Sequence, residues 1–417
     1  MTAELITIEN IIRAGYRLNG IVVETPLQHN ANLSERYGAN IFLKREDLQV
    51  VRSYKIRGAY NCMSNLNAEQ VARGVVCASA GNHAQGFAYS CNLLNIRGRV
   101  YMPATTPNQK IKQVERLGKQ QIEVVLRGDT YDQAYSEAVS YCQKEQKTFI
   151  HPFDDERVVE GQGTVGMEIL NNFKGDIDYL FVPIGGGGLS AGVGTYFAHF
   201  SPKTQLIGVE PQGAPAMLRA LEQGKVVTLP DIDKFVDGAA VQTVGKLNYE
   251  ICRQVLREII LIPEGKICTF ILQLYNEEAI VVEPAGALSI AALDLYAEQI
   301  RGKNVVCIVS GGNNDIERMP EIKDRSLIYE GLKHYFIIKF PQRAGALRDF
   351  LDKVLGADDE ITDFEYTKKH NRNSGPAMVG IELKHKEDYA PLIERMGANN
   401  YEYIVVNDNY NLFSFLV

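Results

Sequence analysis

The 417-residue sequence has neither an excess of basic residues nor a long apolar run. Its formal net charge is -7 at pH 7, which gives no electrostatic reason to bind nucleic acid or an anionic membrane. No stretch approaches the ~20 apolar residues of a membrane-spanning helix. Residues 1–10 also lack the basic start and apolar run of a secretory signal. We therefore expect a cytoplasmic protein without a nucleic acid or membrane partner.

The cysteines lack the spacing of a metal site or a disulfide framework. They are scattered, odd in number and never spaced as C-x-x-C. This predicts free thiols in a reducing compartment and no bound metal. The seven positions are Cys62, Cys77, Cys91, Cys142, Cys252, Cys268 and Cys307.

The part of the chain from about residue 21 to about residue 309 alternates short apolar runs with longer helical patterns. Fully apolar strands between helices predict an α/β fold with buried, mostly parallel sheets. Ligands bind such sheets at the carboxyl ends of the strands, so the loops after the strands are the places to look for chemistry. The clearest runs are 41–43, 74–77, 99–102, 179–182, 206–209 and 304–309.

The pattern changes after residue 312. Residues 318–333 are charged and show no strand pattern, which indicates a connector. The segments that follow have the βαββαβ order of a ferredoxin-like α+β domain. They are a strand at 334–340, a helix at 344–355, strands at 361–369 and 377–383, a helix at 388–397 and a strand at 401–407. We expect domains at 1–320 and 334–417, joined by 321–333.

The first loop with chemical potential surrounds Lys55. A lysine that forms a Schiff base must lose its proton, although its ordinary pKa is ~10.4. Burial and nearby cations both lower a lysine pKa, and Arg45, Arg52 and Arg57 are close in the sequence. Taken alone, the segment is better explained as a solvated basic face, because most lysines are exposed.

The second loop, residues 78–86, follows an apolar strand. Its small residues leave backbone N–H groups open, and the start of the next helix favours an anion such as a carboxylate. Asn82 can donate a hydrogen bond to a ring hydroxyl. An ordinary helix cap by Ser79 or Asn82 explains the loop equally well, and a lone histidine is more often structural than a base. The candidate residues are Ser79, Ala80, Gly81, Asn82 and His83.

The third loop is a run of four glycines after a strand. Glycine weakens both strands and helices, so the run implies close approach of the backbone to another group. Amides at a helix start bind phosphate, and residues 184–198 contain no Lys or Arg. A phosphate held without a cation keeps its second pKa, about 6, and can act as an acid. The candidates are Gly185, Gly186, Gly187, Gly188 and Leu189.

The same residues allow a competing interpretation. Gly186-x-Gly188-x-x-Ala191 loosely fits a dinucleotide-binding fingerprint, and Glu210 closes the next strand near the position of a ribose-binding acid. A nicotinamide-dependent dehydrogenase is therefore a real alternative, although it leaves the other loops unexplained.

The fourth loop, residues 310–314, follows the last strand of the α/β part. Ser310 can hydrogen-bond a heterocycle nitrogen, and a simple turn is the alternative. Glu283 lies between two strands in an apolar stretch. It can reach the site or cap the helix that follows, and the cap is slightly favoured.

The four loops together resemble those of pyridoxal-phosphate enzymes of the tryptophan-synthase-β type, and the match is close to the threonine deaminase (threonine ammonia-lyase) family. The matching strings are Lys44-Arg45-Glu46-Asp47, Ser53-Tyr54-Lys55, Ser79-Ala80-Gly81-Asn82-His83, Gly185 to Gly188 and Ser310-Gly311-Gly312-Asn313. The resemblance covers essentially the whole chain and implies a two-lobed catalytic part, with the smaller lobe at roughly 50–150.

The resemblance also implies roles. Lys55 would carry the pyridoxal phosphate, Asn82 would bind its ring hydroxyl and Ser310 its pyridine nitrogen. Gly185 to Leu189 would hold its phosphate, and Ser79 to His83 the substrate carboxylate. A serine at the ring nitrogen leaves the ring neutral and a weaker electron sink, which favours elimination over long-lived carbanions. The implied reaction converts L-threonine, or alternatively L-serine, into a 2-oxo acid and ammonia.

Two positions separate this chain from related racemases. In serine racemases that resemble this fold, a serine stands where this chain has Ala80, and alanine cannot transfer a proton. Racemisation is therefore disfavoured. Those relatives also hold a divalent metal near the segment that matches 210–216. Glu210 is present here, but Ala216 replaces a carboxylate, so a metal there is not expected.

The C-terminal part resembles the ACT-like regulatory domain of biosynthetic threonine deaminases, in one copy. Arg343, Gly345 and Leu347 lie between its first strand and helix, where such domains bind amino acids, and a plain turn is the alternative. The resemblance implies inhibition by isoleucine, opposed by valine, and a homotetramer. Three other hypotheses stay open: a serine dehydratase or β-replacement enzyme of the same fold, the dehydrogenase, and an amino-acid sensor without catalysis.

Overall fold

The computed structural model describes residues 6–366 and 373–407. The chain divides into two compact units. The first contains residues 1–264 and 274–314, and the second contains residues 265–273 and 315–417. Within the described residues, no helix has both the length and the apolar character needed to cross a membrane.

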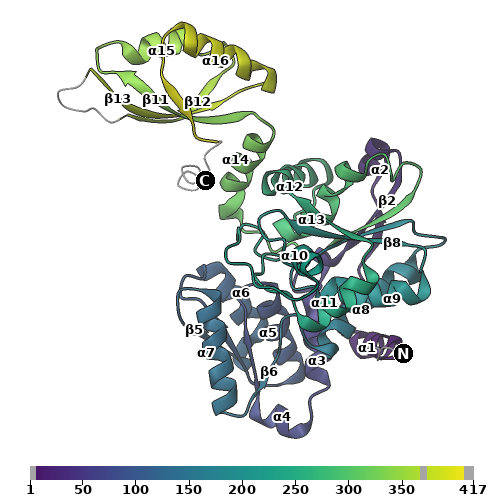
Figure 1. Ribbon diagram of the computed structural model, residues 1–417. Helices are drawn as coiled ribbons and strands as arrows, with labels where there is room; N and C mark the ends of the chain where they lie inside the picture. Colours follow the sequence, from purple (N-terminus) through teal and green to yellow (C-terminus); the bar gives the residue numbers. More distant parts are fainter. Residues whose placement is uncertain (1–5, 367–372, 408–417) are drawn as a thin grey trace. The chain divides into compact units, whose positions relative to one another are not determined.

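A six-stranded sheet forms the larger lobe of the first unit (Figure 1). Its strand order is β1-β2-β10-β7-β8-β9. Only β1 is antiparallel to its neighbour, and the other pairs are parallel. The strands are β1 (Leu27–His29), β2 (Asn40–Arg45), β7 (Tyr179–Pro183), β8 (Gln205–Pro211), β9 (Glu258–Ile262) and β10 (Asn304–Val309).

A separate four-stranded parallel sheet forms the smaller lobe, in the order β5-β4-β3-β6. Its strands are β3 (Val75–Ala78), β4 (Gly98–Met102), β5 (Ile122–Leu126) and β6 (Thr148–Phe149). The prediction of a two-lobed α/β fold with mostly parallel sheets is confirmed. The carboxyl ends of β2, β3, β7 and β10 lead into the four loops singled out above.

The helices of the first unit connect these strands (Figure 1). They are α1 (Ile8–Leu18), α2 (Ala31–Tyr37), α3 (Lys55–Ser64), α4 (Ala68–Arg73), α5 (Asn82–Leu94), α6 (Asn108–Gly118), α7 (Tyr131–Lys144), α8 (Glu156–Asn172), α9 (Gly188–Phe200), α10 (Ala216–Gln223), α11 (Lys246–Val255), α12 (Glu264–Glu278) and α13 (Pro284–Ala291). Part of α12, residues 265–273, belongs to the second unit.

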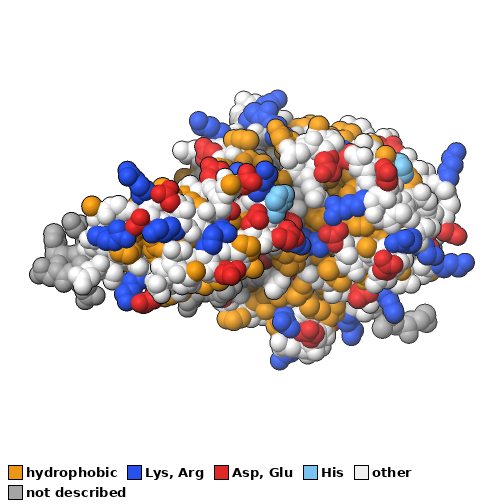
Figure 2. Space-filling view, turned by 90° about the horizontal axis from the view of Figure 1, so that it is seen from above, with side chains coloured by type: hydrophobic (Ala, Val, Ile, Leu, Met, Phe, Trp, Pro, Cys, Tyr) orange, Lys and Arg blue, Asp and Glu red, His pale blue; other side chains and the backbone are white. Residues whose placement is uncertain are grey.

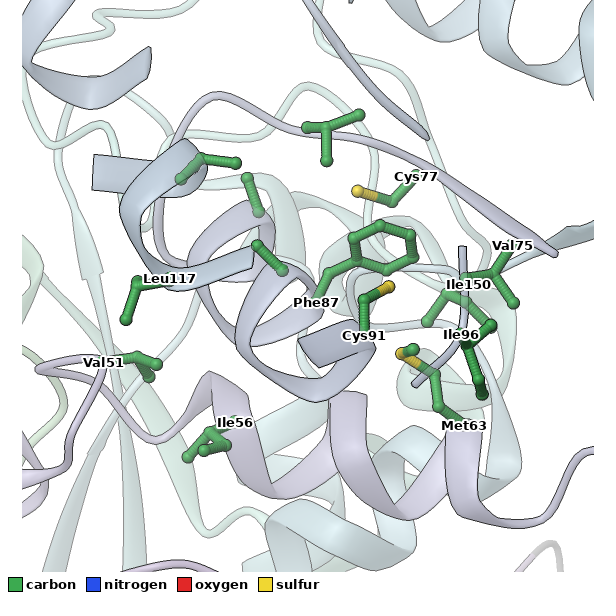
Figure 3. Close-up of a cluster of buried hydrophobic side chains, with 14 of the residues drawn as sticks. Val51, Ile56, Met63, Val75, Cys77, Phe87, Cys91, Ile96, Leu117 and Ile150 are labelled. Atoms are coloured by element: carbon green, nitrogen blue, oxygen red, sulfur yellow. The ribbon is translucent and has the colours of Figure 1, made fainter. Parts of the chain in front are cut away.

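Apolar side chains from α3, α5 and β3 form a buried cluster in the smaller lobe (Figure 3). Phe87 lies beside Cys91 there, and both are fully buried. Ile56, the residue after Lys55, packs into the same cluster. The core therefore anchors α3 directly behind the candidate lysine. All seven cysteines are free and buried.

The second unit contains a four-stranded antiparallel sheet in the order β12-β13-β11-β14. Its elements are α14 (Met319–Tyr329), β11 (Lys333–Pro341), α15 (Ala346–Val354), β12 (Glu360–Tyr366), β13 (Ser374–Glu382), α16 (Tyr389–Ala398) and β14 (Tyr403–Val405). The predicted ferredoxin-like order is confirmed. The segment predicted as a connector contains α14, and residues 367–369 of the predicted strand 361–369 lie outside the described residues.

Charged side chains of both signs are interspersed over the face shown in Figure 2. Among the described residues of this face, neither the blue nor the red side chains gather into one large area. This distribution agrees with the small net charge of the chain. The face in this view therefore has no broad area of one charge that would attract a polyanion.

Candidate active site

The loops that follow β7 and β10 meet the first residues of α3 and α5 around one cavity of the first unit. Its walls thus come from segments far apart in the sequence, at the carboxyl ends of the strands, where ligands bind in this architecture. The lining residues are Tyr54, Lys55, Asn82, Pro183, Gly185, Gly238, Ala239, Glu283, Ala285 and Ser310.

Lys55 is the first residue of α3, and backbone hydrogen bonds to the loop after β10 hold its segment in place. The Tyr54 N–H donates to the Ser310 carbonyl at 3.2 Å, and the Gly312 N–H donates to the Arg52 carbonyl at 2.9 Å. The Lys55 amine donates to the Pro152 carbonyl at 3.0 Å. The structure therefore brings the predicted lysine and the predicted serine loop together.

Burial lowers the pKa of Lys55 from 10.5 to about 8, and the Glu283 carboxylate opposes this change. The prediction that neighbouring arginines contribute is wrong. Arg45 pairs with Asp47, Arg57 is enclosed by carboxylates, and Arg52 is exposed to solvent. The cause of the lowered pKa is therefore desolvation of the amine.

Asn82 begins α5 and is fixed by two side-chain contacts. Its Nδ2 donates to Glu283 Oε1 at 2.6 Å, and its Oδ1 accepts from Asn313 Nδ2 at 2.7 Å. Asn313 is itself tied to the Val51 carbonyl at 2.9 Å. The Asn82 amide therefore has one orientation. One of its two N–H groups serves Glu283, and the other is left for a ligand in the cavity.

Glu283 is a site residue that the sequence interpretation undervalued. It stands at the N-cap of α13, but its side chain makes no capping hydrogen bond. The carboxylate lies instead in the cavity, against Gly311, where an added Cβ would come within 2.5 Å of Glu283 Oε1. Burial, with a smaller contribution from Asp237, raises the pKa of Glu283 to about 7. The sequence feature that could have revealed Glu283 as a site residue is the presence of an acidic side chain in an otherwise apolar stretch.

The four-glycine loop connects β7 to α9, which begins at Gly188. Gly187 has a φ of 90°, a conformation that favours glycine. A Cβ on Gly186 would run into the Phe153 ring, and the Gly186 carbonyl accepts from Asn248 Nδ2 at 2.8 Å. The loop therefore presents the backbone at the start of a helix, where N–H groups and the helix dipole favour an anion.

Ser310 follows β10 and lines the cavity. It is 3% exposed, and its hydroxyl donates to the Ala285 carbonyl at 3.2 Å. This is a long hydrogen bond for a hydroxyl donor, so the proton can turn toward a better acceptor in the cavity.

Comparison with known proteins agrees with this geometry. Residues 18–311 match the family model of pyridoxal-phosphate dependent enzymes. Residues 324–416 match the model of the C-terminal regulatory domain of threonine dehydratase. The biosynthetic L-threonine dehydratase IlvA of Halalkalibacterium halodurans is 60% identical over 412 residues, which cover 99% of each chain. The chain belongs to the threonine dehydratase family.

Other relatives support the same family assignment. The biosynthetic L-threonine dehydratase IlvA of Bacillus subtilis is 58% identical over 413 residues, 99% of this chain and 98% of that one. The structure of threonine deaminase isoform 2 from Solanum lycopersicum is 40% identical with a TM-score of 0.72, covering 77% of this chain and 94% of that chain. The structure of maize serine racemase, with a TM-score of 0.72 and 28% identity over 78% of this chain and 99% of that chain, shows that the fold is shared more widely.

The loop from Ser79 to His83 contributes mainly its backbone and Asn82. Ser79 Oγ accepts from the Gly81 N–H at 3.3 Å, so this hydroxyl braces the loop. His83 is buried and its Nε2 lies 3.0 Å from the Ile150 carbonyl. Burial lowers the pKa of His83 to about 3. It is thus a neutral ring that packs against the loop, and the structural interpretation of this histidine holds for this threonine dehydratase family member.

Glu210 does not serve as a ribose-binding acid. Its carboxylate accepts the N–H groups of Met217 and Leu218 at 2.7 and 2.9 Å, at the start of α10. Burial raises the pKa of Glu210 to about 8. With both oxygens engaged by backbone, the carboxylate is unavailable to a dinucleotide. Within the described residues there is no group of three or more His, Cys, Asp or Glu side chains arranged for a metal.

In the second unit, the candidate effector loop lies between β11 and α15. Gly345 is the N-cap of α15 with a φ of 80°, and Arg343 forms an ion pair with Asp349. Leu347 is exposed. The loop thus carries a cation paired with Asp349, a glycine at the start of α15 and an exposed apolar side chain.

Proposed function

We propose that the chain removes water and ammonia from L-threonine and yields 2-oxobutanoate, the entry to isoleucine synthesis, with pyridoxal phosphate held on Lys55. The observation that carries this proposal is the Lys55 amine with its lowered pKa, inside a cavity bounded by the glycine loop, Asn82 and Ser310. The membership in the threonine dehydratase family supports the same reaction.

The cavity fits the cofactor at each of its polar groups. The Lys55 amine is the attachment point for the aldehyde carbon. The amides of residues 185–189 suit the phosphate, because they lie at the start of α9, where backbone N–H groups and the helix dipole favour an anion. Asn82 has one N–H left for the ring hydroxyl. The Ser310 hydroxyl can exchange its long bond to Ala285 for the ring nitrogen.

The cofactor, when bound, takes up the electron pair left on the substrate α-carbon after proton loss. Lys55 binds the cofactor and then takes the α-proton, because burial brings its pKa close to neutral. Ser310 offers a neutral hydroxyl where a carboxylate would protonate the ring, so departure of the β-hydroxyl is favoured. The open amides at the start of α5, between Ser79 and His83, orient the substrate carboxylate.

The test is conversion of threonine by the purified protein. We expect a yellow protein that forms a 2-oxo acid from L-threonine, and a Lys55→Ala variant that is colourless and inactive. Lys203→Ala, at an exposed position, is the matched control and should behave as the wild type. A Lys55→Ala variant with full activity would contradict the proposal. Turnover of L-serine, with and without an added thiol, separates threonine deamination from serine dehydration and β-replacement.

The second unit serves in feedback control by isoleucine, with valine as the opposing effector. The match to a threonine dehydratase regulatory domain supports a regulatory role, and the loop with Arg343, Gly345 and Leu347 is the candidate effector site. Arg343→Ala should weaken isoleucine inhibition and leave uninhibited turnover unchanged. Inhibition at unaltered isoleucine concentrations in this variant would place the effector elsewhere.

The enzyme works as a cytoplasmic homotetramer with domains at 1–320 and 334–417 and a connector at 321–333. Tyr275 and Val281, both in the first unit, leave 55% and 52% of their surfaces exposed, and a contact with another subunit would cover them. Size-exclusion chromatography with light scattering measures the assembly. A monomer at micromolar concentration would overturn this part.

A further inference from the structure

The helix α8 lies between two helices that both begin at the cavity (Figure 1). One neighbour is α3, which begins with Lys55, and the other is α9, which begins at Gly188 of the glycine loop. Any change in the packing of α8 therefore changes the separation between the lysine amine and the glycine-loop amides.

The contact between α3 and α8 is made backbone to backbone. A Cβ on Gly58 of α3 would lie 2.7 Å from the Val158 carbonyl oxygen, and a Cβ on Gly161 of α8 would lie 2.6 Å from the Arg57 carbonyl oxygen. Backbone atoms cannot swing aside as a side chain can. The two glycines therefore fix how closely α3 approaches α8.

A buried charge cluster fixes the register of the same two helices. It consists of Lys44, Glu46, Arg57 and Glu168, and its net charge is zero. Arg57 lies two residues after Lys55, and all five of its N–H groups donate hydrogen bonds. The acceptors are Glu46, which follows β2, and two residues of α8, Thr164 and Glu168. A planar guanidinium engaged on every side permits only one rotation of α3 against α8.

The contact between α8 and α9 is equally close. A Cβ on Gly192 of α9 would run into the Val159 carbonyl oxygen and would lie 2.6 Å from the Gly163 nitrogen. The loop before α8 adds a further link, since the Pro152 carbonyl accepts from the Lys55 amine and the Phe153 ring lies against Gly186. One helix and its leading loop thus touch both ends of the site.

We propose that α8 is a spacer that sets the distance between the Lys55 amine and the glycine-loop amides to the length of one cofactor molecule. Gly58, Gly161, Gly163, Gly192 and the charge cluster are positioning residues in this role. The inference rests on the proposed function. A small rigid ligand anchored at both ends gains affinity from the second anchor only when the spacing matches, and a mismatch of ~1 Å can cost ~10²-fold.

The test compares pyridoxal phosphate with pyridoxal, which lacks the second anchor. Full-length protein freed of cofactor is titrated with each compound and reduced with borohydride, and modification of Lys55 is quantified by mass spectrometry. The ratio of the two half-saturating concentrations measures the advantage of the phosphate. We expect Gly192→Ala to reduce this ratio by at least about tenfold, with little change in the capture of pyridoxal.

Gly194→Ala is the matched control, because it lies on the same helix and the atoms nearest to its Cβ belong to the Val255 and Leu206 side chains, not to backbone. It should keep the wild-type ratio. Gly163→Ala replaces Gly192→Ala if that variant does not fold, and we expect a smaller fall in the same direction. Its Cβ would lie 2.9 Å from the flexible Ile11 Cδ1 and 3.1 Å from the Gly192 carbonyl oxygen. A wild-type ratio in the folded variant overturns the spacer. A wild-type protein without any phosphate advantage, or without capture at Lys55, overturns the proposed site itself.

Discussion

Replacing Lys55 by methionine should stabilise the cofactor-free protein at neutral pH. Burial lowers the pKa of this lysine from 10.5 to about 8. At pH 7 the amine is charged in both the folded and the unfolded chain, so folding includes the desolvation of a charge. The difference between the two pKa values corresponds, at ~1.4 kcal/mol per pH unit, to a cost of about 3 kcal/mol. Methionine has similar length and no charge, and it removes this cost.

The sign of the pH dependence makes the test specific. The penalty in the wild type is complete below pH 8 and disappears above pH 10.5, where the lysine is neutral in both states. The stability advantage of Lys55→Met should therefore shrink by about 2 kcal/mol between pH 7 and pH 9.5. The loss of the hydrogen bond to Pro152 offsets part of the advantage itself, so its change with pH is the more decisive quantity.

Equilibrium unfolding in urea at the two pH values measures this change. Lys203→Met, at an exposed position, is the control. Its change in unfolding free energy between pH 7 and pH 9.5 is subtracted from that of Lys55→Met. An advantage of Lys55→Met that stays constant from pH 7 to pH 9.5 would refute the reasoning. It would mean that the amine is not desolvated in the folded chain, so that burial does not make Lys55 reactive at neutral pH.

Three further predictions concern the same unit. Phe87→Ala should lower the free energy of unfolding by about 3–5 kcal/mol, because the ring is fully buried; a variant that melts like the wild type would contradict the core assignment. Glu283→Gln should move the rise of kcat with pH to lower pH, because the Glu283 carboxylate raises the pKa of the Lys55 amine, which is free to take a proton only in the substrate complex; a shift to higher pH would show that Glu283 does not raise this pKa. Gly186→Ala should raise the cofactor concentration for half occupancy roughly tenfold, since its methyl group meets the Phe153 ring and overpacking costs at least ~1 kcal/mol. Unaltered occupancy would show that the glycine loop can shift to accept the methyl group without weaker cofactor binding.

The strands and the loops after them were predictable because their signal is local. The run 304–309 is apolar throughout and forms β10 over the same residues, since a strand buried on both faces needs apolar side chains at every position. The ferredoxin-like order was readable for the same reason. The proximity of the four loops could then be predicted, because parallel strands place their carboxyl ends along one edge of a sheet.

The partners of charged residues were not predictable, because they depend on how helices pack. Arg57 lies close in sequence to Lys55, which suggests that it acts on the lysine. In the structure it is enclosed by Glu46 and by Glu168, which is 111 residues away. Likewise, Glu283 has the sequence position of a helix cap, and only the meeting of α5 with the loop after β10 turns its carboxylate to Asn82.

The sequence of α8 conflicts with its own structure, and the conflict is informative. The helix has 17 residues, of which three are glycines. Each glycine in a helix interior costs about 1 kcal/mol relative to alanine, so α8 is weakened by roughly 3 kcal/mol. Gly161 stands where a Cβ would strike the backbone of α3, and a Cβ on Gly163 would press on the Ile11 side chain and on the Gly192 carbonyl oxygen of α9. Local helix stability is given up where close approach of two site-bearing helices requires it, as expected of residues selected for the geometry of a site.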